Sequence, residues 1–172
     1  HELVPTSSTM GLLINPTSPN LSAIQSKAVQ VAARARGVEL LIVQASTERE
    51  IELAFNTLAQ RRVGGVVISA DALFTGQREQ LGVLSARRAI PAIYQWREFA
   101  KAGGLMSYGT SLTDTFRRVG VYAGRILNGE KPGDLPVQQA AKIELIINLK
   151  TAKALGVNVP NTLIGRADEV IE

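Results

Sequence analysis

The chain has 172 residues, of which 45% are apolar and 20% charged, the composition and length of one globular domain with its own core. Its 19 Lys and Arg against 15 Asp and Glu give a net charge of +4, but these cations are scattered and occur in neighbouring pairs only at Arg61-Arg62, Arg87-Arg88 and Arg117-Arg118. We interpret the pairs as solvated helix faces and predict no nucleic-acid partner. Without cysteine, disulfides, thiolate catalysis and cysteine-metal sites are excluded, and no apolar run approaches the roughly 20 residues of a membrane span.

Strands and helices alternate through the first two thirds of the chain. The apolar runs predict strands at Met10–Ile14, Val38–Val43, Gly64–Ser69, Pro91–Tyr94 and Gly104–Tyr108. Helices are predicted between them, from Ser18 or Asn20 to about Arg36, from Ser46 or Thr47 to Arg61, from about Thr75 to Arg88 and from Arg97 to Ala102. Near-continuous apolar strands suit a parallel sheet that is covered on both faces. The repeated strand–helix order therefore predicts an α/β fold with a doubly wound parallel sheet, in a Rossmann-like lobe.

The pattern changes after Gly109. A helix is predicted over Ser111–Asn128, with an apolar stripe at Leu112, Phe116, Val119, Ala123, Ile126 and Leu127. A turn-rich connection, GEKPGDLP, leads to a predicted strand over Lys142–Leu149 and a short helix over Thr151–Leu155.

Polar side chains gather where the predicted strands end. In an open parallel sheet, ligands bind in the crevice at the carboxyl ends of the strands. We therefore expect the turn Asn15–Asn20 and the strand ends at Tyr94 and Tyr108 to face one crevice. The candidate ligand-binding residues are Asn15, Thr17, Ser18, Ser46, Ser69, Asp71, Tyr94, Gln95, Ser107 and Tyr108.

Two of these candidates have alternative interpretations. The turn NPTSPN is either a proline-stiffened connection with a helix cap, or a helix N-terminus that holds a carboxylate or phosphate. Asp71 either grips an amine or caps the helix that is predicted to begin near Thr75. Tyr94 and Trp96 either line the crevice or pack under the loops.

No catalytic constellation is visible in the sequence. The only histidine is His1, so a Ser-His-Asp arrangement has no base. The first strand is followed by no glycine-rich phosphate loop, and no His, Asp or Glu cluster has metal-ligand spacing. We therefore predict a binding protein that is not an enzyme and needs no cofactor or metal.

Several segments together resemble the ABC transporter substrate-binding proteins of the tryptophan/tyrosine-binding type. They are LLINPTSPN, VVISADALF, PAIYQWREFAKAGGLMSYG, TDTFRRVGVYAGRILNGEKPGDLPV and ELIINLKTAKALGVNVPNTLIGRADEVIE, which cover nearly the whole chain in order. The resemblance implies a type I periplasmic binding protein, in which two α/β lobes joined by a hinge close on a small ligand, such as an aromatic or other amino acid. It also implies export, a lipoprotein anchor, and delivery of the ligand to a membrane permease.

The resemblance implies a division of the chain as well. Family members carry a complete first lobe ahead of this segment, so we expect residues 1–109 to be the second lobe. Residues 110–172 are then expected to be the elements that return to the first lobe and hinge. By position, the second-lobe contacts fall at Asn15, Thr17, Ser18, Ser69, Asp71 and Tyr94, with Ser107 and Tyr108 by the hinge.

If the first lobe is absent, the C-terminal third has two unsatisfied surfaces. The apolar stripe of the helix Ser111–Asn128 is expected to be exposed, and the strand around Leu145–Ile147 is expected to be an unpaired edge. We therefore expect the chain to associate with itself through this region as a two-fold dimer. The alternatives are that the segment packs back onto its own lobe or is disordered.

Two other classes of protein share this architecture. A signalling receiver domain has an aspartate after its third strand, as here, but needs acidic residues after the first strand and a lysine after the fifth. Here those positions hold Asn15-Pro16 and Ser107-Tyr108, which disfavours a receiver. The effector-binding core of a transcription regulator has the same fold as a binding protein. No helix-turn-helix precedes the core here, and the local motifs favour the transporter family.

Overall fold

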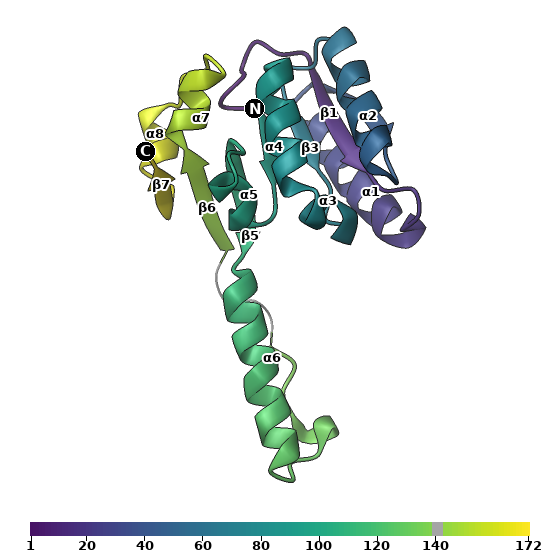
Figure 1. Cartoon of the computed structure of the whole chain (residues 1–172), viewed down its shortest axis with the longest axis vertical. Helices are drawn as coiled ribbons and strands as arrows, with labels where there is room; N and C mark the ends of the chain where they lie inside the picture. Colours follow the sequence, from purple (N-terminus) through teal and green to yellow (C-terminus); the bar gives the residue numbers. More distant parts are fainter. Residues whose placement is uncertain (139–142) are drawn as a thin grey trace.

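One seven-stranded sheet organises the molecule. The computed structural model describes residues 1–138 and 143–172, and Figure 1 shows it with a helical arm that leaves the body. The strand order is β2-β1-β3-β4-β5-β6-β7, and every neighbouring pair is parallel except the antiparallel pair β5–β6. The predicted α/β fold with a mainly parallel sheet is thus confirmed.

The element bounds follow the predicted alternation closely. The strands are β1 (Thr9–Ile14), β2 (Glu39–Gln44), β3 (Val66–Ile68), β4 (Ala92–Tyr94), β5 (Met106–Thr110), β6 (Ile143–Asn148) and β7 (Glu169–Ile171). The helices are α1 (Pro19–Ala35), α2 (Glu48–Gln60), α3 (Ala72–Gly76), α4 (Arg78–Arg88), α5 (Arg97–Lys101), α6 (Leu112–Leu127), α7 (Leu149–Ala154) and α8 (Asn161–Ile164), with a 3₁₀ turn η1 at Pro132–Asp134.

The two faces of the sheet are covered unequally. The chain runs from β1 out to β2 and then back past β1 to β3, so right-handed crossovers place α1 and α2 on opposite faces. The α2 face holds the main core, with Phe55, Phe74, Leu81 and Phe99 completely buried. By contrast, Ser22 is the one buried residue of α1.

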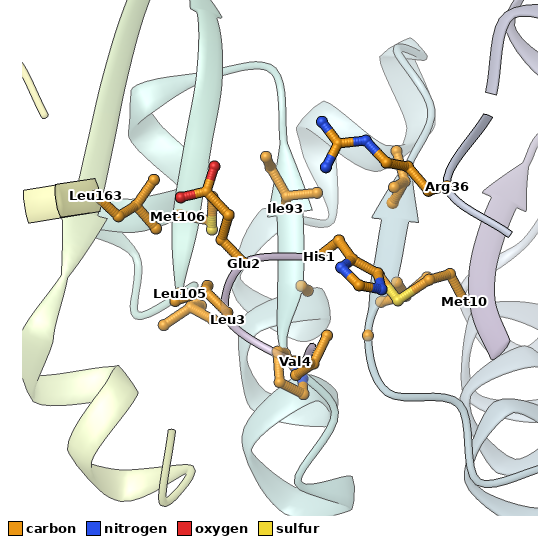
Figure 2. A pocket seen from close by; sticks show the side chains of 15 residues that line it. His1, Glu2, Leu3, Val4, Met10, Arg36, Ile93, Leu105, Met106 and Leu163 are labelled. Atoms are coloured by element: carbon orange, nitrogen blue, oxygen red, sulfur yellow. The ribbon is translucent and has the colours of Figure 1, made fainter. Parts of the chain in front are cut away.

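An apolar groove lies on the α1 face, along the amino-terminal halves of β3, β4 and β5. Figure 2 shows the N-terminal residues lying across this groove, which has a volume of about 370 Å³. Its lining includes Met10, Ile93, Met106 and Leu163. The groove is therefore at the opposite end of the strands from the predicted ligand crevice.

The arm is built around α6, which has no buried residue. In Figure 1 it extends away from the sheet, and the segment that follows it runs back alongside. The Tyr122 hydroxyl donates to the Pro136 carbonyl at 2.5 Å, and Arg125 pairs with Glu130. Phe116 is 67% exposed and Leu127 is 87% exposed, so the predicted apolar stripe of α6 faces solvent.

Three predictions about elements need correction. The single helix predicted over Thr75–Arg88 is two helices, α3 and α4, which meet at Gln77. The fifth strand begins at Met106 and extends to Thr110, later than predicted. The strand predicted from Lys142 begins at Ile143 in the structure, and Lys142 itself lies outside the described residues.

The expected unpaired edge in the C-terminal third is wrong. β6 pairs with β5 on one side and β7 on the other, and Leu145, Ile146 and Ile147 are buried. A second core cluster joins β6 to α7 and α8 through Leu105, Ala152 and Leu163. Residues 143–172 therefore belong to the same sheet as residues 1–109, because β5 itself supplies the neighbour that β6 needs.

Candidate functional site

The candidate site lies where the strand order reverses. The chain leaves β1 toward β2 on one side and enters β3 on the other, so the turns after β1 and β3 flank a switch point of the sheet. Asn15 follows β1, and its Nδ2 donates to Asp71 Oδ1 at 2.9 Å. Ser18 Oγ, in the same turn, donates to Asp71 Oδ2 at 2.9 Å. Two turns far apart in sequence are thus joined by one carboxylate.

Asp71 is held in its ionised form by its neighbours. Burial opposes the charge, but hydrogen bonds from Asn15, from the Leu73 amide and from Ser18 outweigh it and lower the pKa of Asp71. The Leu73 amide donates a hydrogen bond of 2.9 Å to Asp71 Oδ1, which makes Asp71 the N-cap of α3. The capping interpretation is therefore confirmed, although the helix begins at Ala72 rather than near Thr75. Because Oδ1 accepts two of these hydrogen bonds and Oδ2 one, the second position on Oδ2 can still accept a ligand amine.

The turn after β1 is fixed by Asn15. Asn15 is buried, and its Oδ1 accepts from the Thr17 amide at 3.0 Å and from Thr17 Oγ1 at 2.8 Å. Ser18 occupies the N-cap position of α1 but makes no capping hydrogen bond, and its hydroxyl instead donates to Asp71. The Asp71 carboxylate beside this helix N-terminus repels an anion, which disfavours the interpretation of the turn as a site for a carboxylate or phosphate.

Tyr94 brings the end of β4 to Asp71, and together with Asn15 and Ser18 these residues form what we call the Asp71 cluster. Its hydroxyl donates to the Asp71 carbonyl at 3.1 Å and shares a 2.7 Å hydrogen bond with Thr75 Oγ1. The ring is only 2% exposed and meets Phe99 edge to face at 5.9 Å. Burial raises the pKa of Tyr94, so its hydroxyl stays neutral. Tyr94 and Asn15 therefore lie at the same end of the sheet, where their strands end, and the Tyr94 ring packs beneath the loops.

A small aromatic cavity of about 240 Å³ adjoins Tyr94. Two charged groups that the sequence did not single out, Arg78 and Glu98, stand at its wall beside Trp96. Glu98 was within reach of prediction because it follows Trp96 by two residues. Arg78 was not, since its position depends on the break between α3 and α4. The full lining is Thr75, Arg78, Tyr94, Trp96, Glu98, Phe99 and Leu112.

Other predicted site residues lie apart from the Asp71 cluster. The Ser46 amide and hydroxyl both donate to Glu50 at 2.7 Å, which makes them part of the α2 cap. Ser69 is buried directly after β3, where its amide donates to the Leu13 carbonyl, and Ser107 is buried in the sheet opposite Ile146. Tyr108 is 57% exposed. Among the described residues, no hydrogen bond links Ser46, Ser107 or Tyr108 to Asp71.

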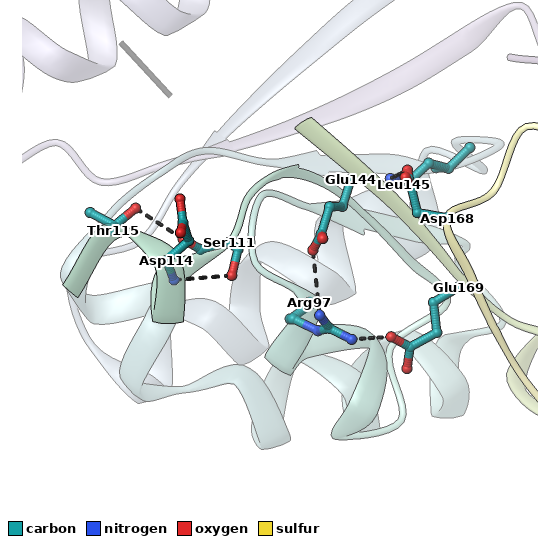
Figure 3. Close-up of polar contacts among 8 residues, drawn as sticks. All are labelled: Arg97, Ser111, Asp114, Thr115, Glu144, Leu145, Asp168 and Glu169. Carbon is teal, nitrogen blue, oxygen red and sulfur yellow. Dashed lines mark hydrogen bonds and ion pairs between the residues drawn. The ribbon is translucent and has the colours of Figure 1, made fainter. Parts of the chain in front are cut away.

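The loop after β4 is tied to the last strands of the sheet. Figure 3 shows Arg97, the first residue of α5, donating to Glu144 of β6 and to Glu169 of β7. The Gln95 carbonyl passes so close to β5 that a Cβ built on Gly109 would lie 2.2 Å from its oxygen. The segment that carries Tyr94, Gln95 and Trp96 is therefore anchored to the strands from which the arm departs.

Comparison with known proteins gives the family. The model of the ABC transporter substrate binding protein family matches residues 1–171. This chain belongs to that family. A tyrosine-binding protein of Clostridioides difficile is 26% identical over 153 residues, which cover 89% of this chain and 44% of that protein. The family match favours a transport binding protein over the core of a transcription regulator.

Solved structures agree on the fold. A conserved domain protein from Vibrio cholerae superposes with a TM-score of 0.87 at 22% identity, covering 98% of this chain and 56% of that one. An ABC domain from Streptococcus pneumoniae in complex with L-Trp superposes with a TM-score of 0.86 at 22% identity, covering 99% and 57%. The chain therefore spans about half the length of the relatives it matches.

Two kinds of feature are absent from the described residues. Within residues 1–138 and 143–172, no helix is long and apolar enough to cross a membrane. The same residues include no group of three or more His, Cys, Asp or Glu side chains placed to hold a metal ion.

Proposed function

We propose that this chain is one lobe of the solute-binding component of an ABC importer and holds a small molecule at the carboxyl ends of β1, β3 and β4. The observation that carries the proposal is the Asp71 cluster. It joins Asn15, Ser18 and Tyr94 at the switch point of the sheet, in a chain of the substrate-binding family. These groups are hydrogen-bonding partners without an activated nucleophile, so the proposed activity is binding without turnover.

The proposed ligand is an amino acid, with an aromatic side chain as the first choice. The ionised Asp71 supplies a counter-charge for an ammonium group, and the cavity beside Tyr94 and Trp96 offers aromatic walls. The names of two relatives, one a tyrosine-binding protein and the other solved with L-Trp, support this choice.

The proposed second lobe accounts for the arm. Relatives are about twice as long as this chain, and α6 presents an apolar stripe to solvent. We place residues 1–109 in one lobe and assign α6 to the surface of the other. The assignment of residues 110–172 to the first lobe and hinge then applies to the arm alone, since β6 and β7 pair within this sheet. In the 172-residue chain by itself, we propose that two copies pair through the same stripe.

The proposed setting follows from the family. Proteins of this kind work in the periplasm or outside the cell, often on a lipid anchor, and pass their ligand to a membrane permease. We propose both the location and the permease partner for the protein that contains this chain.

Backbone NMR of the 172-residue chain tests the proposed site. Millimolar L-Tyr or L-Trp is expected to shift the amide signals of residues 15–18, 71–75 and 94–98, with weak affinity, because one lobe supplies about half of the contacts. Glycine at the same concentration is the control for the aromatic side chain. Shifts confined to the groove lined by Met10 and Ile93, or no shifts with either aromatic amino acid, would contradict the proposal.

A further inference from the structure

Helix α1 buries little apolar surface against the sheet. Ser22 is its one buried residue, while Leu21, Ile24 and Val31 are 43%, 68% and 61% exposed. Burial of large apolar side chains is the usual way to hold a helix on a sheet. Since α1 makes little use of it, its few hydrogen bonds to the rest of the chain carry more of the attachment.

Two of these hydrogen-bonding side chains reach the turns of the candidate site. Ser22 Oγ donates to the Asn15 carbonyl at 2.6 Å. One helical turn further on, Gln25 Nε2 donates to the Ala70 carbonyl at 3.1 Å, and Gln25 Oε1 accepts from the Ala70 amide at 2.6 Å. The contacts of α1 thus fall on the residue after β1 and on the residue directly before Asp71.

The Gln25 amide engages Ala70 as a neighbouring strand would. β3 ends at Ile68, so the main chain at Ala70 has left the sheet. A side-chain amide presents a donor and an acceptor side by side and can satisfy both main-chain groups of one residue. Fixing both groups restricts the rotation of the Ala70–Asp71 peptide unit, and this rotation decides where the Asp71 carboxylate points.

We infer that Gln25 is a positioning residue of the ligand site, which holds the turn after β3 so that Asp71 meets Asn15 and Ser18. The inference rests on the proposed function in so far as the positioned carboxylate serves a ligand. Gln25 lies outside the Asp71 cluster and acts on it only through the main chain of Ala70. A merely structural anchor would contribute to stability without affecting the state of the carboxylate.

The test compares the same substitution at two places on α1. Gln25→Met keeps the length of the side chain and removes both hydrogen bonds, whereas Gln30→Met is the control on the exposed surface of the helix. The first readout is the pKa of Asp71, which is measured without ligand from the carboxyl carbon NMR signal as the pH is varied. The Tyr94 hydroxyl, which faces the Asp71 main chain, stays neutral throughout this titration.

Gln25→Met is expected to raise the pKa of Asp71 toward its ordinary value, because the donors Asn15 and Ser18 no longer align with the carboxylate. The control should leave it unchanged. The second readout is the affinity for L-Tyr or L-Trp by NMR titration, which Gln25→Met should weaken about tenfold, the equivalent of one or two hydrogen bonds. Gln25→Ala also removes both hydrogen bonds without adding a charge, and is expected to raise the pKa of Asp71 in the same direction.

The two readouts separate this inference from the proposed function. A raised pKa of Asp71 in Gln25→Met, without ligand binding by any variant, would support the positioning role of Gln25 and refute the proposed binding of an aromatic amino acid. An unchanged pKa and affinity in Gln25→Met would overturn positioning. If Gln25→Met does not fold, Gln25→Ala decides: a pKa of Asp71 equal to that in the Gln30→Met control would refute the inference.

Discussion

At the scale of single residues, Asp71 shows how one side chain can be both structural and functional. It caps α3, joins the turns after β1 and β3, and keeps a position on Oδ2 open. Burial alone would favour the neutral carboxyl, but the three donors outweigh it. The negative charge at the switch point therefore depends on the geometry of the surrounding turns.

This balance predicts a pH-dependent stability. The folded-state pKa of Asp71 is lowered, so its hydrogen bonds stabilise the fold above the unfolded pKa of about 3.9 and are lost as the pH falls through the folded pKa. Asp71→Asn should reduce the free energy of unfolding by about 1 kcal/mol at neutral pH. Urea unfolding should show this gap close as the pH falls below the unfolded pKa and through the lowered pKa of the folded state. Asp134→Asn, in the exposed turn η1, is the control and should show no gap. A difference for Asp71→Asn that persists at the acid end would contradict the assigned role.

Gly109 makes a second prediction at this scale. A Cβ at this position would lie 2.2 Å from the Gln95 carbonyl oxygen, which is main chain and cannot rotate away. Gly109→Ala should therefore separate the end of β5 from the loop after β4 and cost about 1–3 kcal/mol of stability. Thermal unfolding measures the change. Gly133→Ala, whose Cβ would meet nothing within 4 Å, is the matched control. Equal melting temperatures for the two variants would contradict the prediction, because they would show that the loop after β4 moves away from the new methyl group without loss of stability.

At the scale of elements, local signals were readable and distant pairings were not. Thr47 and Ser111 cap α2 and α6, and Gly37 adopts a positive φ after α1, because each depends on residues a few positions away. The break between α3 and α4 was missed, since Asp71 starts a helix before the predicted one. The burial of β6 was missed as well, because its partner β5 lies across the whole arm in sequence.

The candidate site was predictable in the same measure. The ends of β1, β3 and β4 were identified from the rule for parallel sheets, and the structure brings Asn15, Ser18, Asp71 and Tyr94 together. The direction of the Ser18 hydroxyl was not predictable, because a serine before a helix ordinarily caps it. The role of Gln25 was not predictable either, because a glutamine within a helix gives no local sign of a contact with a distant turn.

At the scale of the whole molecule, the exposed stripe of α6 predicts self-association of the 172-residue chain. Burying one large apolar side chain contributes about 1.5–3 kcal/mol, and Phe116, Val119 and Leu127 are all more than half exposed. A two-fold pairing of α6 helices would cover them. Sedimentation velocity at micromolar concentration should show a dimer, and Phe116→Glu combined with Leu127→Glu should restore the monomer.

The control for this prediction is Val137→Glu, which changes an exposed residue outside α6 and should leave the dimer intact. A monomer with an ordered α6, detected by slow amide exchange along the helix, would refute the pairing.

Because β5 pairs with β6 in antiparallel fashion, the arm is an insertion between two neighbouring strands of the sheet. Thr110 is paired directly with Ile143, so residues 111–142 connect two neighbouring strands just as the loop of a β-hairpin does. An Asn-Gly dipeptide, which favours the tight turn of such hairpins, should be able to replace the whole insertion. The shortened protein would be a minimal scaffold that retains the switch point and Asp71 and lacks the exposed apolar stripe of α6, ready to accept a different module between β5 and β6.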